Sequence, residues 1–180
     1  GEVVEWLSVG GDLRAKYRNV DIPNRARDSR FDVSRATVYV EARLIPNRLS
    51  IFVDQQLAPG SSLTREAYLR LNSRDQRFFL AAGQFFLPYG LRLQDDSAFV
   101  RLTTGINFNI PDRGVQAGFE RGPWSTQLAI TNGSGGGVEP DTGKQVSFIV
   151  NYVKQRWRVG ASFNSNDTDT GDRQMQNVFA

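Results

Sequence analysis

The residues from Leu7 to Arg18 decide the fold, and they read LSVGGDLRAKYR. Every second residue from Leu7 onward is apolar or small, except for the aromatic Tyr17, and the residues between them are mostly polar or charged. Because successive side chains of a strand point to opposite faces, this alternation predicts a strand with one apolar and one charged face. The pattern recurs along the chain, so the sequence predicts an all-β protein.

Nine strands are predicted from this period of two, and a tenth is indicated near the carboxyl end. Their residue ranges are 7–18, 35–44, 49–56, 63–71, 77–87, 114–121, 124–132, 145–153, 156–164 and 174–180. One short helix is predicted over residues 95–104, because the Asp95-Asp96-Ser97 start suits a helix N-terminus.

The gaps between the predicted strands alternate in length. The first gap, residues 19–30, is long, whereas residues 45–48, 122–123 and 154–155 form short turns. In an up-and-down meander, alternate gaps lie at the same end of the sheet. Long loops at one end and tight turns at the other are typical of an outer-membrane β-barrel. The tight-turn end also carries aromatic residues that could form an interfacial girdle, namely Trp6, Trp124, Tyr152 and Trp157.

Alternation alone fits both a barrel in lipid and a soluble sandwich. A sandwich packs large side chains on its apolar face, but here that face includes Gly11, Ala15, Ala36 and other small residues. The opposite face carries many charges of both signs, as a watery lumen would. The sequence therefore predicts a single domain over residues 1–180. Its fold is an antiparallel up-and-down transmembrane β-barrel of nine to ten strands, or an incomplete part of a larger barrel.

Composition excludes most enzyme classes. The 180 residues include no Cys and no His, which removes disulfides, Cys-ligated metal sites and Ser-His-Asp chemistry. No apolar run approaches the ~18 residues of a transmembrane helix. Residues 166–172 lack the distal Glu of a calcium loop, and residues 133–137 lack the Lys of a phosphate loop and suggest a flexible linker. We predict no enzymatic activity, no cofactor, no metal site and no nucleic-acid partner.

Arginine dominates the basic residues, with 19 of the 22. Its rigid guanidinium group favours fixed contacts with carboxylate or phosphate. A row of such groups along a lumen lowers the barrier for an anion at successive depths. The predicted pore-lining residues are Arg14, Lys16, Arg18, Arg35, Arg43, Arg70 and Arg158. The alternative is that they satisfy a polar wall by pairing with Asp12, Glu41, Asp54, Glu66 and Glu120.

The longest predicted loop is residues 88–113. Connections beyond ~12–15 residues in compact folds are usually functional or disordered, and this loop carries enough apolar side chains to need a packing partner. We therefore predict that it folds into the barrel mouth and forms a constriction. The residues expected there are Arg92, Asp95, Asp96, Arg101 and Arg113. The alternative is a loop that folds outward over the rim or onto a partner.

Three motifs carry a family resemblance. They are GQFFLPYGL at residues 83–91, PDRGVQAG at 111–118 and LAITNGSG at 128–135. In this order they resemble the phosphate-selective porin O/P family of outer-membrane porins. The resemblance implies a positively lined channel for small anions. The phosphate-selective members have a lysine cluster, whereas Lys16, Lys144 and Lys154 of this chain are far apart in sequence. The resemblance therefore implies a general preference for anions and does not extend to phosphate specificity.

The expected function is therefore passive diffusion of small solutes through the outer membrane of a Gram-negative-type bacterium. An anion preference is left open, with small anionic solutes as the expected partners. Outer-membrane lipid is the expected surrounding, with a homo-oligomer or a membrane assembly partner left open. Two alternatives remain from the sequence. One is a non-conducting barrel that anchors or encases a partner in a larger assembly. The other is a soluble all-β binding domain.

Overall fold

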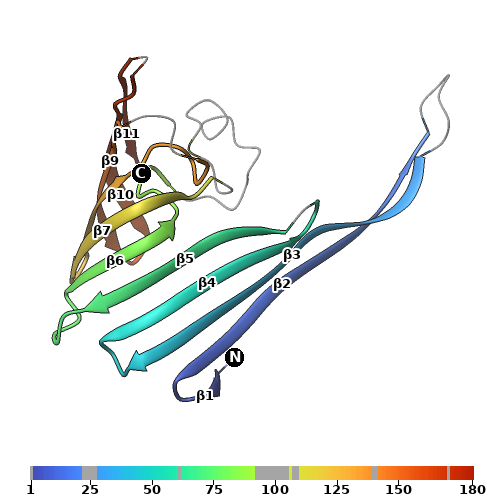
Figure 1. Ribbon diagram of the computed structural model, residues 1–180, viewed down its shortest axis with the longest axis horizontal. Coiled ribbons are helices and arrows are strands. Elements are labelled where there is room, and N and C mark those ends of the chain that lie inside the picture. The colour runs from blue at the N-terminus through green and yellow to red at the C-terminus, as the bar shows by residue number, and fades with distance from the viewer. Residues whose placement is uncertain are drawn as a thin grey trace.

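One antiparallel sheet contains every strand in the described part of the chain (Figure 1). The computed structural model describes residues 2–21, 28–60, 62–91, 106, 110–138, 142–169 and 171–180. Eleven strands follow one another in sequential order, each hydrogen-bonded to the next. They are β1 (Glu2–Val4), β2 (Leu7–Val20), β3 (Asp28–Ile45), β4 (Leu49–Ala58), β5 (Leu63–Asn72), β6 (Phe78–Phe85), β7 (Asp112–Arg121), β8 (Trp124–Thr131), β9 (Gln145–Lys154), β10 (Trp157–Asn166) and β11 (Arg173–Phe179).

The ten predicted strands correspond to β2–β11, and β1 is an additional strand of three residues. The all-β, up-and-down architecture is thus confirmed, and the described residues contain no helix. The helix predicted at residues 95–104 lies outside them. The sheet is strongly bent but open, since β1 and β11 stand at its two edges with one neighbour each (Figure 1). A closed barrel, one of the two forms expected from the sequence, is therefore not observed within the described strands.

The β2–β3 hairpin is longer than predicted, because a β-bulge interrupts the alternation. Arg14 pairs with Arg35, whereas the next residue of β2, Ala15, pairs with Val33, so Ser34 is an extra residue in β3. A bulge of this kind shifts the side-chain alternation by one position. The strand was predicted to begin at Arg35 because the pattern breaks there. In fact β3 begins at Asp28. The apolar residues before the bulge lie on the same face of the sheet as those after it.

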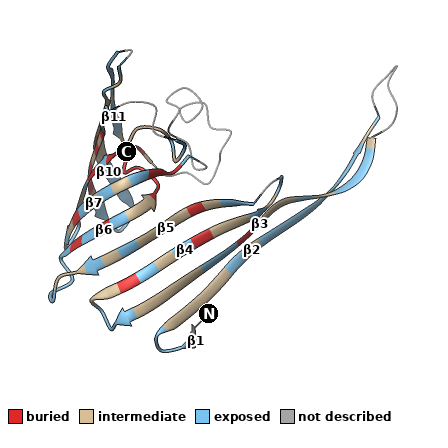
Figure 2. Ribbon diagram, viewed as in Figure 1, coloured by how far each residue is buried: buried red, intermediate tan, exposed pale blue. Residues whose placement is uncertain are grey.

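The polar face of the sheet is the more buried one, and the apolar face remains accessible (Figure 2). Along β9, for example, Gln145, Ser147 and Asn151 are buried on one face, and Val146 and Phe148 alternate with them on the other. Described apolar side chains that stay exposed on the second face are Val38, Ile51, Val53, Leu69, Leu71, Leu80, Val115, Leu128, Ile130 and Val159. This arrangement is the inverse of a soluble sandwich, whose apolar faces form the core.

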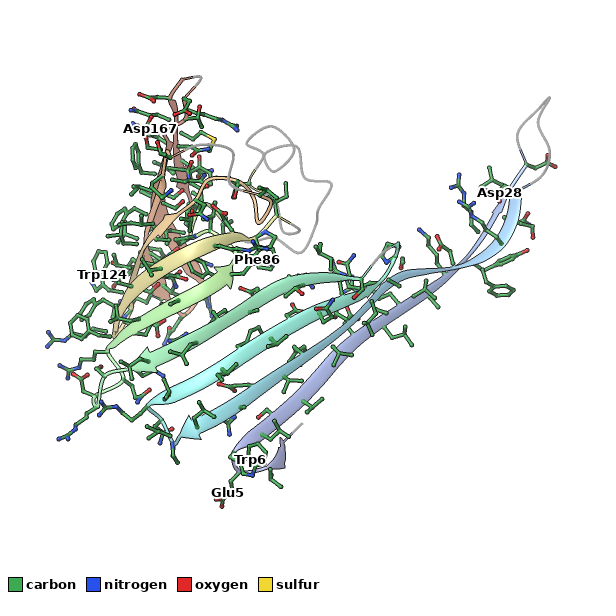
Figure 3. All side chains as sticks on the ribbon, viewed as in Figure 1. Glu5, Trp6, Asp28, Phe86, Trp124 and Asp167 are labelled. Carbon is green, nitrogen blue, oxygen red and sulfur yellow. The ribbon has the colours of Figure 1, made fainter. Side chains whose placement is uncertain are left out.

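The short turns share one edge of the sheet, as predicted, and aromatic side chains cluster there. The Trp124 and Tyr152 rings are 4.8 Å apart between centroids, and those of Tyr152 and Trp157 are 5.5 Å apart. Phe78 and Phe119 form a further pair at 4.8 Å on the same edge. Trp6 lies in the β1–β2 turn, at the same end of the strands as Trp124 (Figure 3).

Candidate functional site

The concave face is the candidate site, and we use this name for the polar face inside the bend of the sheet. Its half on β2–β5 carries charges that are mostly paired. The Arg14 Nε lies 3.0 Å from the Asp12 carboxylate, and the Arg35 guanidinium lies 3.9 Å from the same group. Arg43 and Glu41 are 3.5 Å apart. These contacts support the alternative in which basic residues satisfy a polar wall.

Lys16 and Arg18 lie beyond that wall. They pair with Asp32 and Asp28 at 3.7 Å each, on the part of the β2–β3 hairpin where β3 has no partner in β4. The predicted pore-lining set is therefore split, because these two residues belong to a two-stranded ribbon that projects from the sheet (Figure 1).

The guanidinium groups of Arg70 and Arg158 contact aromatic rings and amides. The Arg70 group lies 3.9 Å from the centroid of the Phe79 ring, and its Nε donates to the Asn72 side chain at 3.0 Å. Arg158 donates two hydrogen bonds, at 3.0 and 2.7 Å, to the Asn151 side-chain oxygen. Both residues thus have fixed partners on the concave face.

Arg65 is the charged residue that the sequence pattern missed. Asp54 pairs with Glu66 and Gln55 pairs with Thr64, so Arg65 is an extra residue in β5. The bulge lets its side chain become buried, 3.5 Å from the Asp54 carboxylate. By simple alternation Arg65 belongs to the apolar face. A charged residue on an apolar face was the one sequence signal that could have indicated the bulge.

The other half of the concave face, on β7–β10, is lined by amides and hydroxyls. The Gln145 side-chain nitrogen donates to the Asn164 oxygen at 3.0 Å, and the Asn164 nitrogen donates to the Ser147 hydroxyl at 2.6 Å. A second contact of this kind joins Gln116 to Gln127 at 2.9 Å. Buried polar groups need such partners, since an unsatisfied one costs about 1–3 kcal/mol. These contacts join uncharged polar groups, whereas Arg158 on β10 and Asp112 on β7 are charged residues of this half.

Residues 86–91, here called the internal strap, cross the concave face directly after β6. At one end, the Phe86 N–H donates to the Glu66 carboxylate at 3.3 Å and the Phe86 ring faces Arg65 (Figure 3). At the other end, the Gly90 N–H donates to the Ser162 hydroxyl on β10 at 3.0 Å. The strap therefore connects β5 to β10 on the inner side of the sheet. Its side chains supply much of the small buried apolar cluster.

Asp112, at the start of β7, fastens the glycine-rich loop after β8. Its carboxylate accepts hydrogen bonds from the backbone N–H groups of Gly133 (2.6 Å), Gly136 (3.3 Å) and Arg113 (2.9 Å), and it is 1% exposed. Gly133 has a φ of +87°, which favours glycine. The stretch expected to be a flexible linker is thus a turn held by a buried carboxylate. A cavity of about 110 Å³ lies beside it.

Most residues of the predicted constriction cannot be placed. Arg92, Asp95, Asp96 and Arg101 lie outside the described residues. Arg113 is described, and its position corrects the prediction. It belongs to β7, and its Nε donates to the Gln84 side chain at 3.1 Å. Because neighbouring residues of a strand alternate, Arg113 points away from the concave face that Asp112 occupies.

No group of three or more acidic residues that could hold a metal ion occurs in the described part of the chain. The polar loop after β10 contains one acidic pair of note. A hydrogen bond with Asp172, together with its charge, raises the pKa of Asp167 above its usual value.

Comparisons with known proteins do not identify a family. No family model matches the chain, and no curated protein matches it. Across the described segments, no helix is long and apolar enough to cross a membrane. The resemblance to the phosphate-selective porin O/P family thus rests on three short motifs. The first of them, residues 83–91, contains the internal strap, and the other two contain Asp112 and the loop it holds.

Proposed function

We propose that this chain forms part of the wall of an outer-membrane β-barrel and that small hydrophilic solutes diffuse along its concave face. The observation that carries the proposal is the inverted burial of the sheet. Polar side chains such as Thr37, Ser147 and Asn164 are buried on the concave face, while the apolar face is accessible. In a barrel wall the apolar face contacts lipid and the concave polar face contacts water, so each face of this sheet would meet a solvent of its own polarity.

Strand length supports a bilayer-spanning wall. Five strands, β4, β5, β7, β9 and β10, have ten residues each. At about 3.4 Å per residue such a strand is roughly 34 Å long. A tilt of about 45° reduces its height to roughly 24 Å, close to the ~25 Å apolar band of outer-membrane barrels. The aromatic cluster at the short-turn edge fits one interfacial girdle of that band.

Closure of the wall needs a partner for each free edge. The three-residue β1 pairs only with Leu7 and Ser8, so β2 forms the rest of its edge of the sheet. Strands β2 and β11 run in opposite directions, because each strand from β2 to β11 is antiparallel to the next. Ten strands in this order form an even set, as in bacterial barrels. The edges can therefore join antiparallel to each other, or to further strands, without a parallel pair.

The charge distribution supports a modest anion preference. Arg14, Arg35 and Arg43 face carboxylates at 3.0–3.9 Å, so much of their field is compensated. Arg70 and Arg158 contact aromatic rings and amide oxygens. Because the partners of Arg70 and Arg158 carry no charge, these fixed cations favour the passage of anions through a narrow polar path. The internal strap crosses the concave face and would narrow the path of solutes along it.

Extraction and conductance measurements test the proposal. The chain, produced in bacteria, should appear in the membrane fraction, need detergent for solubilisation and give discrete conductance steps in planar bilayers. Recovery in the soluble fraction without detergent would refute the lipid-facing wall and favour a soluble domain. Stable insertion without conductance would favour the second candidate, a structural partner, which the open edges and the strap across the concave face also suit.

A further inference from the structure

The apolar face of the sheet, here called the outer face, becomes polar near the long-loop ends of four neighbouring strands. Residues directly opposite each other in paired strands point to the same side of a sheet, so the register identifies the outer face on each strand. The last apolar residues before the change are Val53 on β4, Ala67 on β5, Ala82 on β6 and Val115 on β7. The next outer-face residues toward the long loops are Gln55, Thr64, Gln84 and Arg113, here called the polar row. In a barrel wall, such a change marks the limit of the apolar band.

Hydrogen bonds connect the polar row from β4 to β7. The Thr64 hydroxyl donates to the Gln55 side-chain oxygen at 2.8 Å, and the Gln84 side-chain nitrogen donates to the Thr64 carbonyl at 2.6 Å. The Arg113 Nε then donates to the Gln84 side-chain oxygen at 3.1 Å. These contacts hold the Arg113 side chain beside β6, at one end of the row.

Arg113 is the cation of the polar row, and its charge is not compensated by a neighbour. The residue is exposed, and the described residues provide no carboxylate partner for its guanidinium group. Gln84 occupies the Nε, which leaves the two terminal nitrogens for a ligand. Guanidinium groups bind phosphate through such paired N–H groups.

The depth of Arg113 in the proposed wall places its charge at a membrane interface. Arg113 stands eight residues before Arg121, the last residue of β7. At about 3.4 Å per residue and a tilt of about 45°, it lies roughly 19 Å above the short-turn edge. The far limit of the ~25 Å apolar band is then roughly 6 Å away. A long arginine side chain can extend its charged end across such a distance while its stem stays in apolar surroundings.

A cavity of about 380 Å³ lies beside Arg113. Its lining includes Ala67, Gln84 and Arg113, which belong to the outer face, so the cavity opens on that face. Gly83 and Gly114 line the rest of it and are direct partners between β6 and β7. These glycines and Ala67 leave space for an apolar chain next to an uncompensated cation. A lipid that carries a phosphate group has the complementary pair, an acyl chain next to an anion.

We propose that Arg113 and the cavity beside it bind a membrane lipid that carries a phosphate group. The terminal guanidinium nitrogens donate hydrogen bonds to the phosphate oxygens, and one acyl chain lies in the cavity along Ala67, Gly83 and Gly114. The site rests on the proposed function in that the outer face meets lipid, and it names the kind of lipid that this face retains at its long-loop end.

Binding of dioleoylphosphatidic acid to the full chain tests the site. The chain is held in an uncharged detergent, and lipid adducts are counted by native mass spectrometry over a range of lipid concentrations. Dioleoylglycerol has the same acyl chains without the phosphate group. Inorganic phosphate, added as a competitor, supplies the anion without the chains. Circular dichroism checks that each variant keeps its strand content.

We expect phosphatidic acid to bind more tightly than dioleoylglycerol and to resist displacement by an equal concentration of inorganic phosphate. Arg113→Gln should weaken phosphatidic acid binding about tenfold, near the low end of what a hydrogen bond to a charged group contributes. Ala67→Phe fills the cavity and keeps the charge, and it should also weaken binding. The matched control Arg121→Gln removes an exposed cation at the other end of the same strand and should leave the affinity unchanged.

The site is refuted if dioleoylglycerol binds as well as phosphatidic acid, or if Arg113→Gln and Arg121→Gln have equal effects. Displacement of the lipid by an equal concentration of inorganic phosphate would also overturn it, because the site would then hold a free anion. These outcomes are separate from those for the channel. A chain that conducts but does not prefer phosphatidic acid overturns only the lipid site, and a chain that binds this lipid through Arg113 but does not conduct overturns only the channel.

Discussion

Replacing Val40 with arginine probes whether the apolar face meets lipid. Val40 lies on that face of β3, paired with Val9 on β2 and Val53 on β4. It stands five residues before Ile45, the last residue of β3. At about 3.4 Å per residue and a tilt of about 45°, Val40 lies roughly 12 Å above the turn edge. That is about half of the ~25 Å apolar band, so Val40 is placed near the bilayer midplane.

The depth sets the expected cost. Arginine on the lipid face costs about 2–4 kcal/mol at the midplane and about 0–1 kcal/mol near the interface. Val40→Arg should therefore lower the folding equilibrium constant roughly 30- to 800-fold. Leu71→Arg is the matched control, because Leu71 lies on the same face, one residue from the turn end of β5. It should cost about 1 kcal/mol or less.

Urea titrations in phospholipid vesicles measure both variants, with the fluorescence of the three tryptophans at the turn edge as the signal. If the apolar face lies in the membrane, arginine must cost clearly more folding free energy at Val40 than at Leu71. A cost below about 0.5 kcal/mol at Val40, the ordinary scatter of surface substitutions, would refute it. So would equal costs at Val40 and Leu71, because the penalty would then not depend on depth.

Two further predictions concern the concave face, and a third concerns the long loop of residues 88–113. Asp112→Asn should destabilise the chain by about 2–3 kcal/mol, because at least one charge-assisted hydrogen bond to the backbone is lost; a urea midpoint unchanged from that of the unmodified chain would contradict the role of this carboxylate. Replacing Arg14, Arg35 and Arg158 together with Glu should lower the anion-to-cation permeability ratio of the channel, and unchanged reversal potentials in a salt gradient would show that these residues are structural. Deleting residues 94–107 should raise single-channel conductance without loss of strand content by circular dichroism; conductance equal to that of the full chain would exclude a constriction there.

Strand existence and face could be predicted from the sequence because both follow from local alternation. The period of two identified every long strand of the described residues, and it placed Val38 and Thr37 on opposite faces, where the structure leaves Val38 exposed and Thr37 buried. Loop lengths identified the end of the sheet where the short turns and tryptophans gather. These properties depend on neighbouring residues in the chain, so no tertiary contact is needed to infer them.

The bulges and the inner contacts could not be predicted in this way. Ser34 and Arg65 are extra residues opposite a continuous partner strand, and a bulge is visible only when both strands are paired. The rings of Tyr39 and Phe79 occupy space that is open because the residues beside them on the next strand, Gly10 and Gly118, have no side chain. The long gap of residues 88–113 predicted Arg113 in the constriction, but its register in β7 directs it to the other face.

By itself, then, the sequence determined which segments are strands, which face of each is apolar and which end carries the tight turns, because alternation and turn chemistry are local. Only the tertiary structure decided how the sheet bends, which arginines face carboxylates and where residues 86–91 run. Those features come from contacts between residues far apart in the chain, such as Gly90 with Ser162 and Asp112 with Gly133. The geometry of these contacts depends on the register of every strand between the two residues. No local sequence pattern specifies the combined effect of those registers.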